Sequence, residues 1–113
     1  MYRNLSPQEF LKDPARFYAI DVRSQPEWDW THEPQAIHIP LPELMARAGE
    51  LPNDKPLVFI CRTGGRSLRA AQVADGMGYE AYNLAGGMMM LLMAKKEKGL
   101  IPAQECERLM GGL

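Results

Sequence analysis

The fold of this chain is decided by one stretch, Leu57-Val58-Phe59-Ile60-Cys61-Arg62-Thr63-Gly64-Gly65-Arg66-Ser67. Its first four residues are apolar without alternation, which is typical of a strand that is buried on both faces. We therefore expect the strand over 57–60 at the centre of a sheet. A helix is predicted to follow over 67–76, with Gly76 or Gly78 ending it.

Further strands and helices alternate along the rest of the chain. Strands are predicted over 18–22, 36–39 and 81–84, and helices over 7–12, 26–30, 42–47 and 88–98. The first helix follows Ser6-Pro7-Gln8-Glu9, a capping box with proline at the first helical position. Because this alternation suits crossover connections, we assign the chain to the α/β class, with a largely parallel sheet and helices on both faces.

The length bounds the domain organisation. With 113 residues, the chain is predicted to form one domain over 1–113, with 99–113 as a C-terminal helical tail. The longest apolar run, 88–94, has seven residues, far fewer than the ~20 that cross a bilayer. The first residues lack the pattern of a secretory signal and the two cysteines are far apart, so we expect a cytoplasmic protein with no membrane partner.

Charge is balanced overall but divided along the chain. Thirteen Lys and Arg residues face 14 Asp and Glu residues, a net charge of -1, so no nucleic-acid partner is expected. The acidic stretch 24–46 holds four acids and no Lys or Arg, and the basic stretch 55–74 holds four bases and no acid. Arg62 and Arg66 belong to the basic stretch and flank the loop after the central strand, where they would attract a small anion. The acidic stretch would either face this basic site or present a surface for protein docking.

The loop over 61–67 carries the chemistry that the sequence predicts. It lies at the carboxyl end of a strand and the amino end of a helix, where parallel sheets bind ligands. Its two glycines allow successive amides to point inward as a nest for an anion. Cys61 alone would be read as a small buried apolar residue. In this nest, with Arg62 and Arg66 beside it, the thiol is expected to shift toward the reactive thiolate.

Further motifs lie on both sides of this loop, in a specific order and spacing. They are Asp21-Val22-Arg23, Glu27-Trp28, His32, Pro34-Gln35-Ala36-Ile37-His38-Ile39-Pro40, Gly78-Tyr79 and Asn83-Leu84-Ala85-Gly86-Gly87-Met88. With the loop, they resemble the rhodanese (sulfurtransferase) family over most of the chain. The resemblance implies a small, largely parallel five-stranded sheet with helices on both faces, and transfer of sulfane sulfur through a cysteine persulfide.

The resemblance also implies substrates and roles. The expected donor is a small sulfur-containing anion such as thiosulfate, or another persulfide, and the expected acceptor is a thiol, cyanide or a protein. Cys61 would be the catalytic residue, with no metal and no cofactor. The substrate would be bound by the other residues of the loop, Arg62, Thr63, Gly64, Gly65, Arg66 and Ser67.

Two other functions stay open beside sulfur transfer. A non-catalytic rhodanese-like binding or sensing module is one, although the intact Cys61 and loop argue against it. Related phosphatases and arsenate reductases have five residues between their cysteine and arginine, whereas four separate Cys61 from Arg66, which favours sulfur. The chain departs from the family where Thr31-His32-Glu33-Pro34-Gln35-Ala36 replaces Gly-His-Ile-Pro-Gly-Ala, and where Leu91 takes the approximate place of a common tryptophan.

Three charged residues before the loop are candidate supporting residues. Asp21 and Arg23 flank the exit of a strand and are interpreted first as a structural ion pair or as braces for the loop. Glu27 is a partner for either Arg23 or Arg66. His32 and His38 have no cysteine pair or carboxylate at ligand spacing, so no metal site is expected.

Cys106 and the two tryptophans complete the set of candidates. Cys106 shares a helical face with Leu109 and Met110, which predicts apolar packing; the alternative is a resolving or sulfur-relay cysteine. Trp28 and Trp30 are two residues apart and cannot share a helical face, so one is expected to pack inward and the other to line the rim of the site.

Overall fold

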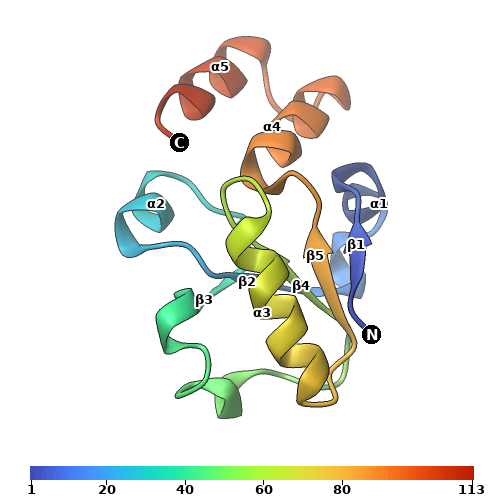
Figure 1. The fold of residues 1–113 in the computed structure, drawn as a ribbon. Coiled ribbons are helices and arrows are strands. Elements are labelled where there is room, and N and C mark those ends of the chain that lie inside the picture. Colours follow the sequence, from blue (N-terminus) through green and yellow to red (C-terminus); the bar gives the residue numbers. More distant parts are fainter.

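Strand β4 (Leu57–Ile60) is the middle strand of a five-stranded sheet in the computed structural model, which describes residues 1–113. All four residues of β4 are buried, as their unbroken apolar run predicted. The strand order is β1-β5-β4-β2-β3, and every neighbouring pair is parallel (Figure 1). The other strands are β1 (Arg3–Leu5), β2 (Tyr18–Asp21), β3 (Ile37–His38) and β5 (Ala81–Leu84).

Helices cover both faces of the sheet, so the predicted α/β architecture is confirmed. One face packs against α1 (Pro7–Lys12), α4 (Gly87–Glu97) and α5 (Ala103–Gly111), and the other packs against α3 (Gly65–Gly76). The strands divide their side chains between two cores, because successive residues of a strand point to opposite faces. Val58 and Ile60 face the first core, whereas Phe59 and Cys61 face the second.

Strand β1 is the element that the sequence pattern does not reveal. It pairs with β5 in the register Arg3↔Tyr82, Asn4↔Asn83 and Leu5↔Leu84, and forms one edge of the sheet. Two of its three residues are exposed. A short edge strand with little buried surface needs no apolar run, so hydrophobicity alone cannot predict it.

The prediction of a helix over 42–47 is wrong. The segment instead forms a 3₁₀ turn over Leu41–Glu43, followed by a second one over Ala48–Glu50. Most backbone hydrogen bonds here reach only to the third residue back, such as Leu44 N to Leu41 O and Glu50 N to Arg47 O, which is the 3₁₀ pattern. The capping box at α1 forms only in part: the Ser6 hydroxyl accepts from the Glu9 amide at 3.0 Å, but the Glu9 carboxylate binds Lys12 at 2.8 Å.

The remaining helices are close to their predicted ranges. Helix α2 (Gln25–Trp30) lies beside the carboxyl edge of the sheet, and the tail forms α5, which packs on α4 (Figure 1). None of the helices has both the length and the apolar character that a membrane crossing requires.

Candidate active site

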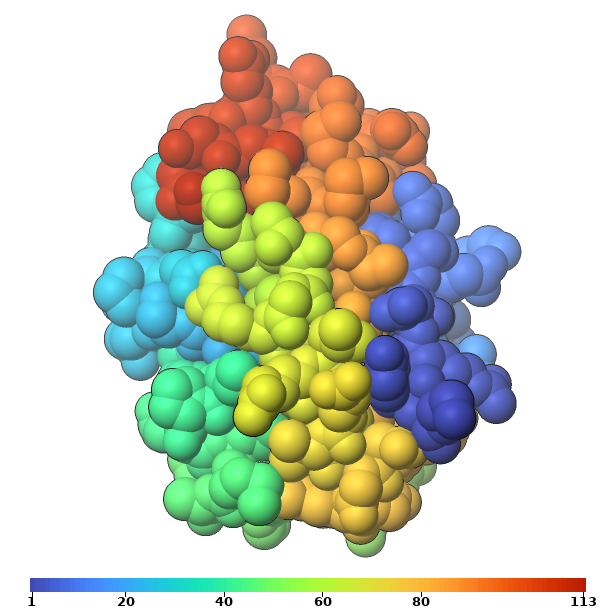
Figure 2. Space-filling view, in the orientation of Figure 1, coloured from blue at the N-terminus to red at the C-terminus, as the bar shows by residue number.

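The loop over 61–64 is held between the end of β4 and the first turns of α3 and α4. Met88 and Met89 donate their amides to the carbonyl oxygens of Cys61 and Arg62, at 2.8 and 3.2 Å. This approach requires glycine at position 87, where φ is +60° and a Cβ atom would overlap the Cys61 carbonyl. The first turn of α4, which Gly87 allows to approach closely, therefore holds the backbone of Cys61 and Arg62 in place. In the space-filling view, the loop and α3 form the central band of one face, between α2 and the β5–α4 connection (Figure 2).

The Cys61 thiol lies at the floor of this loop, and the residue is only 1% exposed. The Gly64 amide donates to Sγ at 3.0 Å, and Ser67 Oγ lies 3.2 Å from Sγ. Gly64 turns the chain back over the sulfur with φ of +116°. Burial raises the pKa of Cys61, but hydrogen bonds from the Ser67 hydroxyl and from the amides of Ser67, Gly64 and Thr63 outweigh it, so the pKa lies below its ordinary value. The loop therefore favours the thiolate.

The Arg66 guanidinium is locked by Glu27 of helix α2. Its Nη1 and Nη2 donate to the two carboxylate oxygens at 2.8 Å each. This pairing lowers the pKa of Glu27 to about 2 and raises that of Arg66. The Arg66 pKa is raised further by the charge of Cys61, which places the guanidinium within electrostatic reach of the thiolate. Of the two partners predicted for Glu27, the structure selects Arg66.

Asp21 and Arg23 form a fully buried ion pair behind the loop. Arg23 Nη2 donates to Asp21 at 2.8 Å and to the Thr31 carbonyl at 2.7 Å. No hydrogen bond joins either residue to the loop over 61–67. The pair instead fixes the segment between β2 and β3, so it forms the structural ion pair that was predicted and makes no bond that braces the loop.

The exposed side of the loop carries positive charge without a counter-ion. Arg62 and Thr63 are exposed, as is Arg69 one turn into α3. Neither Arg62 nor Arg69 forms a salt bridge. A small anion that reaches the loop therefore meets unpaired guanidinium groups.

The expectation that the acidic stretch 24–46 faces the basic site holds only for Glu27. Glu33 pairs with Lys95 of α4, Glu43 with Arg47, and Asp29 accepts from Gln25. Each of these three acids has its partner outside the loop, so the stretch does not act as one surface toward the loop.

Sequence reasoning missed two contacts around the site. Asn83, buried in β5, has its Oδ1 2.5 Å from Ser67 Oγ. A polar residue inside the otherwise apolar strand 81–84 was the available signal. Trp28 stacks on both His32 and His38, with ring centroids 3.6 and 4.7 Å apart, so both histidines pack against the tryptophan.

No group of three or more His, Cys, Asp or Glu side chains is placed to hold a metal ion.

Cys106 and Trp30 lie in the contacts made by the C-terminal tail. Cys106 is buried in the core on the opposite face of the sheet from Cys61, with Sγ 3.5 Å from the Leu92 carbonyl oxygen. This is the apolar packing predicted from its helical spacing, and the sheet separates it from the loop. Trp30 donates its Nε1 hydrogen to the Leu109 carbonyl at 3.0 Å, so α5 is joined to α2.

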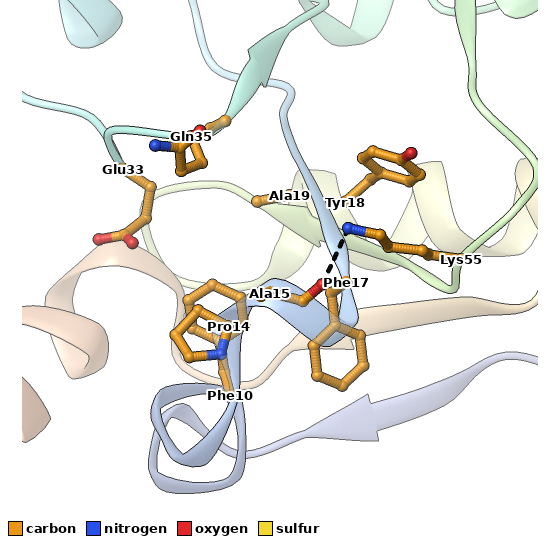
Figure 3. A pocket seen from close by; sticks show the side chains of 10 residues that line it. Phe10, Pro14, Ala15, Phe17, Tyr18, Ala19, Glu33, Gln35 and Lys55 are labelled. Atoms are coloured by element: carbon orange, nitrogen blue, oxygen red, sulfur yellow. Dashed lines mark hydrogen bonds between the residues drawn. The ribbon is translucent and has the colours of Figure 1, made fainter.

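The largest cavity, about 500 Å³, lies away from the thiol. It is lined by residues of α1, the start of β2 and the segment before β3, among them Phe10, Phe17, Ala19 and Glu33 (Figure 3). No residue of the 61–67 loop lines it. None of the other cavities is lined by this loop either, so the buried thiol does not open into a deep pocket.

Known proteins are similar to this chain in sequence and in fold. The family model of the rhodanese-like domain matches residues 6–92. A putative sulfurtransferase, YtwF of Bacillus subtilis (strain 168), is 37% identical over 82 residues, which cover 73% of this chain and 80% of the relative. Among solved structures, a rhodanese-related protein from Thermoplasma volcanium aligns with a TM-score of 0.79 and 25% identity, over 81% of this chain and 92% of that one. The human single-domain sulfurtransferase TSTD1 aligns with a TM-score of 0.67 and 31% identity, over 80% of this chain and 95% of that one. The chain therefore belongs to the rhodanese-like domain family.

Proposed function

We propose that this protein is a sulfurtransferase that carries sulfane sulfur on Cys61, from thiosulfate or another persulfide donor to a thiol, cyanide or a protein acceptor. The observation that carries the proposal is the Cys61 sulfur itself. It is held by the Gly64 amide and the Ser67 hydroxyl at the carboxyl end of the central strand, with its pKa lowered. The sulfurtransferase relatives support the same reaction class.

In the first step, the Cys61 thiolate attacks the outer sulfur of thiosulfate. A sulfur–sulfur bond forms to Cys61 while the bond to the sulfonate sulfur breaks, and the electron pair leaves with sulfite. The total charge is the same before and after, because a thiolate and a dianion give a persulfide anion and sulfite dianion. Arg62 would attract the donor from its exposed position, and the inward amides of the loop would stabilise the persulfide charge.

In the second step, the acceptor attacks the outer sulfur of the persulfide. Its lone pair forms the new bond to that sulfur, and the electron pair of the broken bond returns to Cys61 as the thiolate. The site has no deep pocket, so the acceptor is bound mainly outside the loop. That geometry suits small nucleophiles and also a thiol displayed on another protein.

Arg66 has a positioning role in this mechanism. Both of its terminal nitrogens are taken by Glu27, so it is less free than Arg62 to bind the donor. Its charge would still stabilise the thiolate, and its pairing would fix the first turn of α3. Asp21 and Arg23 would hold the segment between β2 and β3 without touching the reacting atoms.

A thiosulfate:cyanide assay with matched cysteine variants tests the proposal. Cys61→Ser should abolish thiocyanate formation, whereas Cys106→Ser should retain it, because Cys106 lies in the opposite core. A parallel assay on an aryl phosphate should give no turnover. Activity that persists in Cys61→Ser, or phosphate release that depends on Cys61, would overturn the proposal.

A further inference from the structure

Three polar side chains from three elements form a continuous row that ends at the Cys61 thiol. Asn4 of β1 lies opposite Asn83 of β5 in the sheet register, and their amides are joined at 3.0 Å. Asn83 Oδ1 lies 2.5 Å from Ser67 Oγ, and Ser67 Oγ lies 3.2 Å from Cys61 Sγ. Ser67 and Asn83 are buried, whereas Asn4 is exposed. The row thus connects an exposed edge strand with the buried sulfur.

Proton counting shows that this row cannot satisfy every contact at once. A serine hydroxyl has one hydrogen, whereas a thiolate and an amide oxygen are both acceptors. Ser67 can therefore donate to Cys61 or to Asn83 Oδ1, but not to both. With Asn83 Oδ1 toward Ser67, the hydroxyl proton is drawn away from the sulfur.

A half-turn of the Asn83 amide removes the conflict. The amide oxygen and nitrogen exchange places with almost the same shape. The contact with Ser67 Oγ must lengthen from 2.5 Å to about 2.7 Å or more, because an N–H···O bond is longer than an O–H···O bond. Nδ2 would then donate to Ser67 Oγ, and Ser67 would donate to Cys61. Asn83 Oδ1 would face Asn4, whose exposed amide is free to turn in the same way. Two complete hydrogen-bond patterns therefore fit nearly the same atomic positions.

We infer that Asn83 is a positioning residue that sets the direction of the Ser67 proton according to the charge on Cys61. With the thiolate, Asn83 donates to Ser67 and Ser67 donates to the sulfur. With the neutral thiol, the thiol hydrogen is donated to Ser67 Oγ and Ser67 donates to Asn83. In the persulfide the charge lies on the outer sulfur and Sγ carries no hydrogen, so Ser67 is again free to donate to Asn83. Apart from the changes at the Cys61 sulfur itself, only hydrogen bonds in the row change.

The charged groups around the thiol leave this row undisturbed. They are Arg66 and Arg62 in the loop, Glu27 on α2, and the Asp21–Arg23 pair after β2. None of them forms a hydrogen bond with Asn83 or Ser67. The row is therefore uncharged, and the direction of its hydrogen bonds can follow the charge on the Cys61 sulfur.

The pH dependence of Cys61 alkylation by iodoacetamide tests the inference, in a Cys106→Ser background. This readout follows the thiolate, so it does not need sulfur transfer, although the role assigned to Asn83 rests on the proposed function. Asn83→Asp has the same shape but can only accept, so it should hold the Ser67 proton. We expect the midpoint to rise by about one unit, which is about tenfold slower alkylation at acidic pH. Asn83→Ala frees the Ser67 proton and should not raise the midpoint.

Three comparisons decide the result. The effect of Asn83→Asp should shrink when Ser67→Ala is added, whereas a simple charge effect would persist undiminished. Asn4→Asp, at an exposed site, should hold the Asn83 nitrogen toward itself. It should therefore raise the pH midpoint and slow alkylation at acidic pH a few-fold, whereas Asn4→Ala should do neither. Circular dichroism of each variant reports folding, and Asn4→Asp carries the test if Asn83→Asp does not fold. The inference fails if Asn83→Ala acts like Asn83→Asp, if Ser67→Ala leaves the shift intact, or if the aspartates have no effect.

Discussion

At the scale of single residues, the site is governed by a competition at Cys61. Burial of the sulfur opposes the thiolate, and the directed hydrogen bonds of Ser67, Gly64 and Thr63 favour it. The hydrogen bonds win because the loop presents several donors to one atom. The reactivity of Cys61 therefore depends on backbone geometry that Gly64 and Gly87 make accessible.

Glu27→Gln should change how stability depends on pH. The pKa of Glu27 falls from 4.5 to about 2 on pairing with Arg66. A carboxyl group whose pKa is lower in the folded state stabilises the fold at pH values above its unfolded-state pKa. This stabilisation is lost as the pH falls through the folded-state pKa. The free energy of unfolding of the wild type should therefore exceed that of Glu27→Gln at neutral pH, and the difference should shrink between pH 4.5 and about 2.

Urea denaturation across this pH range checks the prediction. Glu97→Gln is the control, because Glu97 is exposed and forms no salt bridge. A difference between wild type and Glu27→Gln that stays constant down to the acid limit would show that the ion pair is not its cause.

The residues of the site were predictable to different degrees. The loop over 61–67 was visible because cysteine, paired glycines and arginines lie close together in the sequence. The choice of Arg66 as partner of Glu27 required the fold, since 39 positions separate them. Asn83 was hidden because its partners Ser67 and Asn4 come from other elements.

At the scale of elements, the C-terminal helix α5 supports helix α2, which carries Glu27. Trp30 of α2 donates to the Leu109 carbonyl, and the Arg108 guanidinium lies 5.5 Å from the centre of its ring. Gly112 packs so closely on the indole that a Cβ atom would overlap it. Helix α5 lies outside the residues matched by the family model. The support therefore comes from a part of the chain that the family model does not match.

Gly112→Ala should destabilise the protein by about 1–3 kcal/mol, the usual cost of forcing an extra carbon into a packed contact. Gly111→Ala is a matched control, because a Cβ atom there meets nothing within 4 Å. Thermal unfolding followed by circular dichroism measures both. Equal melting temperatures for the two variants would contradict the packing of the tail on Trp30.

Elements with a buried face were the ones that the sequence revealed. Strand β4 and helices α3 and α4 follow from apolar patterns and glycine positions. The edge strand β1 and the 3₁₀ turns over 41–50 did not, because β1 depends on pairing with β5 and the turns are too short to show an apolar period. Tertiary contacts, more than local preference, set these segments.

At the scale of the whole molecule, a net charge of -1 hides a basic site. Glu33 and Glu43 of the acidic stretch form ion pairs with Lys95 and Arg47, and Asp29 accepts a hydrogen bond from the neutral Gln25. Arg62 and Arg69 keep their charges unpaired beside the loop. The protein therefore presents a local positive field to a small anion although the chain as a whole is nearly neutral.

Arg62→Gln should lower kcat/KM for thiosulfate several-fold at low ionic strength. The difference from wild type should narrow at high salt, because salt screens the attraction between the guanidinium and the dianion. Arg16→Gln is the control, since Arg16 precedes β2 at the opposite end of the parallel sheet. A loss in Arg62→Gln that does not vary with salt would indicate a contact other than long-range attraction.

The central claim, that Cys61 carries the transferred sulfur, is tested most directly by mass spectrometry of the protein after thiosulfate is added without an acceptor. We predict the addition of one sulfur atom per chain, located on the peptide that contains Cys61, with one sulfite released for each sulfur bound. The sulfur should be lost when cyanide is added, and Cys61→Ser should gain none. An unmodified Cys61, or sulfur found on Cys106 instead, would contradict the account.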